Sequence, residues 1–164
     1  MKTQITYEDL RAMNPCYHPK EIGISSDYSA TIPEFIKEYR DKVKSKEDIL
    51  WVLCREEYMS EKDMRLFAVW CAREALKLVT QPDLRSINAC DVAEKYANGE
   101  ATEEELYAAG DAAGDAARAA SGAAWAAAWA ASAAARGSAS AAAWTATCAA
   151  AWDTQIDKLL TYFE

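Results

Sequence analysis

Apolar residues recur at intervals of three and four along most of the 164-residue chain, which is the period of one face of an α-helix. No segment alternates between apolar and polar residues for long, and residues 23–28 are the only stretch that could form a short extended piece. The pattern predicts an all-α fold, a compact bundle of about six or seven helices. We expect a single domain over residues 1–164, with an N-terminal part at 1–100 and an alanine- and tryptophan-rich part at 101–164.

The most apolar helix is predicted over residues 64–79. Its apolar side chains lie nearly all round the helical circumference, which is typical of a helix surrounded by others. We therefore expect this helix near the centre of the fold, with Phe67 and Trp70 in the core.

Short polar side chains precede each predicted helix and can accept hydrogen bonds from its free amide groups. Several are followed three residues later by a carboxylate, the pattern of a capping box. The predicted N-caps are Thr6, Thr31, Ser45, Ser60, Asp83 and Thr102. Asn98 and Gly99 form the clearest predicted helix end.

The C-terminal part is dominated by alanine, the strongest helix former. At about 100° per residue, one stripe contains Tyr107, Arg118, Trp125, Trp129 and Arg136. A second stripe begins at Trp144 and continues through residues 148–163. The change of stripe predicts a break at residues 136–140 and a long hairpin of two antiparallel helices. The alternative is one continuous helical rod that associates with copies of itself.

The net charge and the cysteine pattern exclude several classes of function. A net charge of −8 argues against binding to a nucleic-acid polymer or to an anionic membrane. The alanine-rich run is too weakly apolar to predict a membrane span, and no N-terminal signal is recognisable. Five cysteines without CxxC spacing, of which Cys54, Cys71, Cys90 and Cys148 occupy apolar helical positions, indicate reduced thiols of a cytoplasmic protein.

No catalytic or metal-binding constellation is recognisable. His18 is the only histidine, and with Cys16 it gives at most two ligands where zinc needs about four. It is also the only histidine that could act as the base for a serine or cysteine nucleophile. We therefore expect no enzyme activity, no metal and no cofactor.

Two groups of residues are candidates for binding. Arg65 and Arg73 flank the apolar helix, and Asp91 and Glu94 lie one turn apart on the next one, so they form either a salt-bridge lattice or a charged cleft. The tryptophans of the first stripe either pack in the core against the helix that carries Trp70 or form an accessible surface. In the second case Arg118, Trp125, Trp129 and Arg136 could stack on a ring and pair with an anion or form a protein-binding hot spot.

The run at residues 65–73, Arg-Leu-Phe-Ala-Val-Trp-Cys-Ala-Arg, is followed by Asp-Val-Ala-Glu-Lys-Tyr-Ala-Asn-Gly-Glu-Ala-Thr at 91–102 and then by the alanine- and tryptophan-rich tail. Together these segments resemble a family of small phage, prophage and bacterial immunity proteins, over residues 5–164. Gly110, Gly114, Gly122 and Gly137 interrupt the repeated blocks that are common in that family. The resemblance implies a protein that neutralises a toxin or a defence effector by binding it.

Two functions follow as hypotheses. The first is a non-enzymatic immunity-type or phage anti-defence inhibitor that binds a protein effector. The alternative is a protein that sequesters a small anionic signalling molecule, such as a nucleotide immune signal. In either case we expect a homo-oligomer whose contacts include residues 108–152, because identical subunits associate most often as symmetric dimers.

Overall fold

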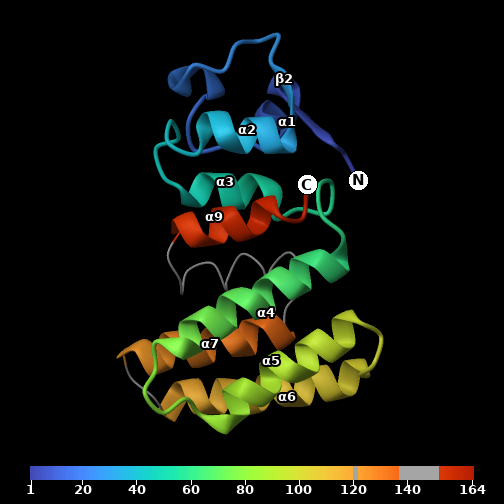
Figure 1. The fold of residues 1–164 in the computed structure, drawn as a ribbon, viewed down its shortest axis with the longest axis vertical. Coiled ribbons are helices and arrows are strands. Elements are labelled where there is room, and N and C mark those ends of the chain that lie inside the picture. Colours follow the sequence, from blue (N-terminus) through green and yellow to red (C-terminus); the bar gives the residue numbers. More distant parts are fainter. Residues whose placement is uncertain (120–121, 137–151) are drawn as a thin grey trace. The chain divides into compact units, whose positions relative to one another are not determined.

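The computed structural model describes residues 1–119, 122–136 and 152–164, without the side chains of residues 122–125 and 136. Within these residues the chain is mostly helical, which confirms the predicted all-α fold (Figure 1). The α-helices are α1 (Tyr7–Ala12), α2 (Ile32–Tyr39), α3 (Glu47–Leu53), α4 (Glu61–Lys77), α5 (Leu84–Ala97), α6 (Glu103–Ala119), α7 (Gly122–Arg136) and α9 (Trp152–Leu160). A 3₁₀ helix, η1 (Pro19–Ile22), and two strands, β1 (Gln4–Thr6) and β2 (Ser29–Thr31), complete the described elements.

The two strands lie outside the stretch in which the sequence allows a short extended piece. They pair antiparallel, with Ile5 opposite Ala30. Residues 23–28 form no strand, so the extended piece is not found there; Gly23 instead ends η1 with a left-handed φ of 86°. Strands of three residues are too short to show an alternating pattern.

Most of the predicted helix starts are confirmed. A side-chain oxygen accepts an amide hydrogen bond at each of Thr6, Thr31, Ser60, Asp83 and Thr102. The prediction for Ser45 is wrong, because α3 begins two residues later and Lys46 at its N-cap provides no side-chain bond. The carboxylate of Asp48 instead accepts a hydrogen bond from the Ser45 amide at 3.0 Å and another from the Tyr17 hydroxyl at 2.7 Å.

The chain forms two compact units, which we describe separately. Unit 1 contains residues 1–59 and 152–164, and unit 2 contains residues 60–151. The expected boundary at residue 100 lies within unit 2, between helices α5 and α6, which pack against each other.

Unit 1 has a core of large aliphatic and aromatic side chains. Most of the fully buried ones come from β1, α2, α3 and α9, and they include Ile5, Phe35, Ile36, Leu50, Leu53, Ile156 and Leu159. Helix α9 packs against α2 and α3. Ion pairs reinforce this contact: Arg40 reaches Asp157 at 2.7 Å and Asp153 at 3.3 Å, and Lys46 also pairs with Asp153. The last helix of the chain therefore completes the core of the N-terminal unit.

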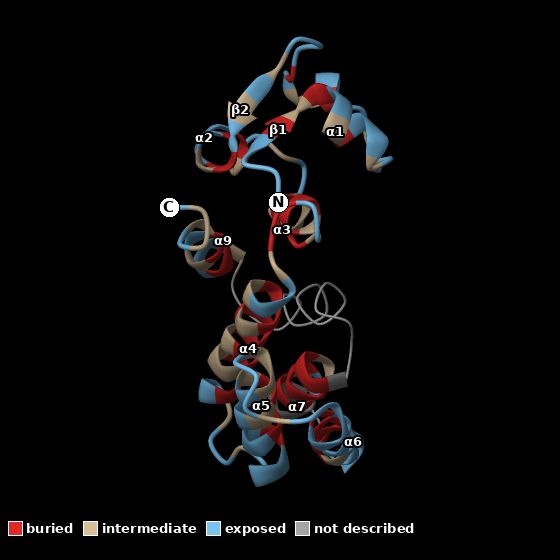
Figure 2. Ribbon diagram, turned by 90° about the vertical axis from the view of Figure 1, so that its right-hand side faces the viewer, coloured by how far each residue is buried: buried red, intermediate tan, exposed pale blue. Residues whose placement is uncertain are grey.

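Unit 2 is a bundle of α4, α5, α6 and α7. Helix α4 packs against α5 and α7, and its Met64 and Phe67 are fully buried. Trp70 is only partly buried, so the expectation that it is a core residue holds in part. Helix α7 contacts all three other helices, and more than half of its described side chains are buried alanines (Figure 2).

The alanine-rich region folds back earlier than the sequence predicts. Helix α6 ends at Ala119 and α7 begins at Gly122, so a single helix over residues 103–136 is wrong. The order of contacts is antiparallel, because Ser132 meets Gly110 while Ala128 meets Ala116 and Ala117. Alanine on both sides of the turn leaves the helical period uninformative there. The predicted break at residues 137–140 and Trp144 lie outside the described residues.

The cysteine positions agree with the prediction where they are described. Cys54, Cys71 and Cys90 are buried, Cys16 is exposed, and Cys148 lies outside the described residues. No helix within residues 1–119, 122–136 and 152–164 combines the length and apolar character of a membrane span.

Candidate functional site

A salt-bridge cluster joins α4 to α5, as one of the two alternatives predicts. The Nη2 atom of Arg73 lies 2.6 Å from a carboxylate oxygen of Glu94 and 2.9 Å from one of Asp91. Hydrogen bonding to Glu94 and then to Asp91 raises the pKa of the Arg73 guanidinium, although burial opposes it. Because all three side chains are more than a third exposed, solvent screens their attraction and the cluster adds little stability.

Arg65 is the only buried charged side chain among the described residues, and it points into unit 2. Its Nη1 donates to the carbonyl oxygen of Ala134 in α7 at 2.9 Å. Its guanidinium lies over the Tyr96 ring at 5.2 Å, and its Nη2 is 3.7 Å from Glu61. Only 3% of the Arg65 surface is exposed, so its charge is not available at the surface. Its hydrogen bond instead links α4 to α7.

The predicted stripe of arginine and tryptophan is divided between two helices, so its single-helix form is wrong. Arg118 lies on α6 and pairs with Asp115, whereas Trp125, Trp129 and Arg136 lie on α7. Trp129 is 43% exposed, and the side chains of Trp125 and Arg136 are outside the described residues. Trp70 stacks on Phe67 within its own helix, with ring centroids 6.4 Å apart.

The outward side of α6 carries a surface that the sequence analysis missed. We define the acidic face of α6 as Glu103, Glu104, Tyr107, Asp111 and Asp115, all of which are exposed. Four of these residues recur at a spacing of four, which places them along one side of the helix. The spacing of four between these residues is itself a signal in the sequence.

Tyr107 is the aromatic residue within the acidic face. Its residue surface is 48% exposed. A hydrogen bond with Glu103 and the charge of that carboxylate raise the pKa of the Tyr107 hydroxyl. The ring therefore stays neutral at physiological pH and combines an apolar surface with a polar tip, a combination that favours protein contacts.

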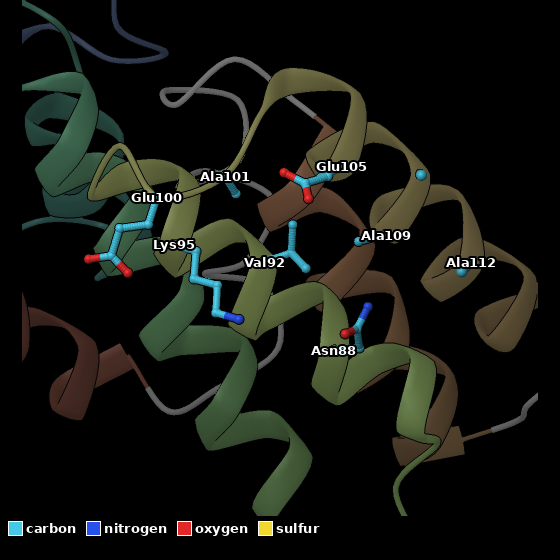
Figure 3. A pocket seen from close by; sticks show the side chains of 9 residues that line it. Asn88, Val92, Lys95, Glu100, Ala101, Glu105, Ala109 and Ala112 are labelled. Carbon is cyan, nitrogen blue, oxygen red and sulfur yellow. The ribbon is translucent and has the colours of Figure 1, made fainter.

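A shallow groove of about 430 Å³ runs between α5 and α6 (Figure 3). Its α5 side presents Asn88, Val92 and Lys95, and its α6 side presents Glu105 and alanines. Glu100 and Glu105 lie at one end. The backbone amide and then the hydroxyl of Thr102 bind the Glu105 carboxylate at 2.7 and 3.0 Å and lower its pKa. The groove can accept a small molecule or an extended chain segment, with one cation and an amide as its polar anchors.

The histidine and the buried cysteines that were considered for catalysis have structural roles. His18 caps η1, its Nδ1 accepting the Lys20 amide hydrogen bond at 3.2 Å. Burial raises the pKa of Cys54 and of Cys90 to about 12, which keeps both as thiols. Within the described part of the chain, no three histidine, cysteine or acidic side chains are grouped so as to hold a metal ion.

The chain matches none of the protein-family models, curated proteins or solved structures with which it was compared. The resemblance to immunity proteins therefore remains an expectation from the sequence.

Proposed function

We propose that the protein is a non-enzymatic, immunity-type inhibitor that binds a toxin or defence effector through the acidic face of α6. The effector surface that it contacts would be basic. In this proposal the protein acts in the cytoplasm and blocks the effector by occupying its surface.

The observation that carries this proposal is the composition of the acidic face. Glu103, Glu104 and Asp111 lie about one turn from the half-exposed Tyr107 on a single helix, in a chain whose net charge is −8. Asp115 lies one turn farther along and is paired with Arg118. Such a surface attracts a basic partner from a distance and rejects acidic ones. Tyrosine is among the residues that contribute most to binding energy at protein interfaces.

Helix α6 is well supported for such a role. Its inner side buries Leu106 and a row of alanines against α5 and α7. Its first turn is fixed by the reciprocal hydrogen bonds of Thr102 and Glu105. A surface that is ordered before binding loses less conformational entropy when the partner arrives.

The test uses two matched double variants. Glu104→Lys with Asp111→Lys reverses charge on the acidic face, and Glu56→Lys with Glu57→Lys makes the same change at exposed positions of unit 1. Tagged proteins are expressed in the native host, and partners are identified by mass spectrometry alongside a protection assay. We expect the α6 variant to lose both its partner and protection while the control retains them. Equal capture and protection by both variants would refute the proposal.

A second candidate function is sequestration of a small anionic molecule, and the α5–α6 groove favours it. Lys95 and Asn88 could bind an anionic group there, although Glu100 and Glu105 oppose negative charge at one end. Mass spectrometry of small molecules released from purified protein, with thermal shifts against a nucleotide panel, tests this candidate. Ligand-free protein that shows no shift with any nucleotide would exclude it.

Self-association is part of the same proposal. The partly exposed Trp129 on alanine-rich α7 offers an apolar contact for a second copy of the chain. Light scattering at micromolar concentration should show a dimer or a larger homo-oligomer that Trp129→Glu weakens. A monomeric mass for the unmodified protein would reject self-association without affecting the proposed effector-binding surface.

A further inference from the structure

A second hollow lies in unit 2, away from the α5–α6 groove. It has a volume of about 200 Å³ and lies where the connection between α4 and α5 meets α6 and α7. Its apolar lining includes Leu76, Val79, Ala116 and Ala128, and Ser86 lines it as well. The lining therefore combines apolar side chains with the polar residues Gln81, Asp83 and Ser86.

Ser86 is unusual among the polar residues of unit 2. It lies in the first turn of α5 and is 0% exposed, and its Oγ has no hydrogen-bond partner. Buried hydroxyl groups normally have a partner, because removing one from water without compensation costs free energy. The combination of a hollow and an unpartnered hydroxyl in its wall points to a ligand that supplies the missing bond.

The charged groups near the hollow limit the kind of ligand that it can bind. Asp83, which also lines it, accepts the Arg85 backbone amide at 2.9 Å and pairs with the Arg85 guanidinium at 2.8 and 3.0 Å. This pair is neutral as a whole, and each Asp83 carboxylate oxygen already accepts a hydrogen bond from the Arg85 guanidinium. An anion would be repelled by Asp83, and a cation would compete with Arg85, so an uncharged ligand fits best.

We propose that this hollow binds a small uncharged amphiphile, of the size and chemistry of a phenol, whose hydroxyl exchanges a hydrogen bond with Ser86. The ring would lie against Leu76, Val79 and the alanines. Ser86 would turn its hydroxyl toward the ligand by a change of χ1 rotamer. The size is suitable, because an apolar protein cavity of about 150 Å³ holds benzene. This inference does not depend on the proposed effector-binding function.

The experiment compares phenol with toluene, which has nearly the same shape and no hydroxyl. Binding of each to the full-length protein is followed by amide and alanine-methyl NMR shifts. We expect phenol to shift signals of Ser86, Ala116 and Ala128 and to bind about tenfold more tightly than toluene, the effect of one ordinary hydrogen bond.

Variants assign that difference to the hydroxyl. Ser86→Ala removes only an unpartnered group and should fold, as circular dichroism can verify. It should lower the affinity for phenol to that for toluene and leave toluene unchanged, whereas Ser29→Ala on the exposed strand β2 should change neither. Absence of saturable binding at millimolar phenol would overturn the proposal, as would equal affinities of the unmodified protein for the two ligands. Unchanged discrimination in the Ser86→Ala variant would overturn it as well.

Discussion

The interior of unit 1 and the interface between α6 and α7 in unit 2 are built from different side chains. Unit 1 fills its interior with phenylalanine, isoleucine and leucine, whereas α6 and α7 bury mainly alanine and glycine. Large side chains remove much apolar surface from water, while alanines remove little but allow helices to approach closely. The alanine pair therefore depends more on hydrogen bonds made at close range, and two of these are buried: Arg65 to Ala134 and Ser132 to Gly110.

The largest expected effect separates the two kinds of core. Phe35→Ala in unit 1 should reduce the free energy of unfolding by about 3–5 kcal/mol, because it leaves a cavity. Ala131→Gly in α7, at a position that is equally buried, should cost about 1 kcal/mol, mainly through helix propensity. Urea denaturation followed by circular dichroism measures both values. Equal losses would show that the alanine core is as dependent on side-chain volume as unit 1.

The next effect tests the contact of Arg65 with α7. Arg65→Met keeps an apolar stem but removes the charged donor to the Ala134 carbonyl, so we expect a loss of about 2–3 kcal/mol. Hydrogen exchange should quicken in α7 more than in α2 or α3. Arg73→Met, which removes a more exposed arginine from the same helix, is the control and should cost less than about 1 kcal/mol. A stable Arg65→Met variant with unchanged exchange would contradict this role.

The sequence predicts these features unequally, and the reason is physical. Side-chain caps such as Thr6 with Asp9 and Thr102 with Glu105 join residues only three positions apart. The sequence therefore predicts them, and the structure contains them. The hydrogen-bond acceptor of Arg65 is a backbone carbonyl 69 residues away in the sequence. Because every residue has such a carbonyl, no residue pattern predicts which one Arg65 binds. The end of α6 at Ala119 and the start of α7 at Gly122 were not predicted, because alanine is abundant in both helices.

The candidate surfaces show the same difference. The pairing of Arg73 with Asp91 and Glu94 was one of two predicted alternatives, because their spacing places the carboxylates on one side of α5. The acidic face of α6 was equally present in the sequence as acidic residues and Tyr107 spaced by four. Its exposure could not be predicted, because it depends on α5 and α7 covering the opposite side of the helix, and these contacts are not local in the sequence.

A smaller effect is expected from the hydrogen bond between α6 and α7. Ser132→Ala removes the buried Oγ that donates to the Gly110 carbonyl at 2.9 Å. We expect a loss of about 1 kcal/mol, the usual net value of such a bond. Thermal and urea unfolding can detect this loss. No change in stability would mean that close alanine packing alone holds the two helices together.

The smallest expected effect depends on pH. The Thr102 hydrogen bonds hold the pKa of Glu105 below its ordinary value of 4.5, so the cap stabilises the fold above that value. This contribution is lost as the pH falls through the lower folded-state pKa. Glu105→Gln should therefore be less stable than the unmodified protein at pH 7, and the difference should shrink at about pH 3. Glu104→Gln, which leaves this cap intact, should show no comparable dependence; a constant difference for Glu105→Gln would contradict the assignment.

The most direct test of the proposed effector-binding surface is site-specific photo-crosslinking in the native host. A photoreactive phenylalanine analogue replaces Tyr107 in one variant and the exposed Glu56 in another. The proposal predicts that position 107 crosslinks to one basic effector protein in high yield and that position 56 does not. Crosslinking of that protein from position 56 alone, or no specific crosslink from position 107 in a protein that still protects the host, would contradict it.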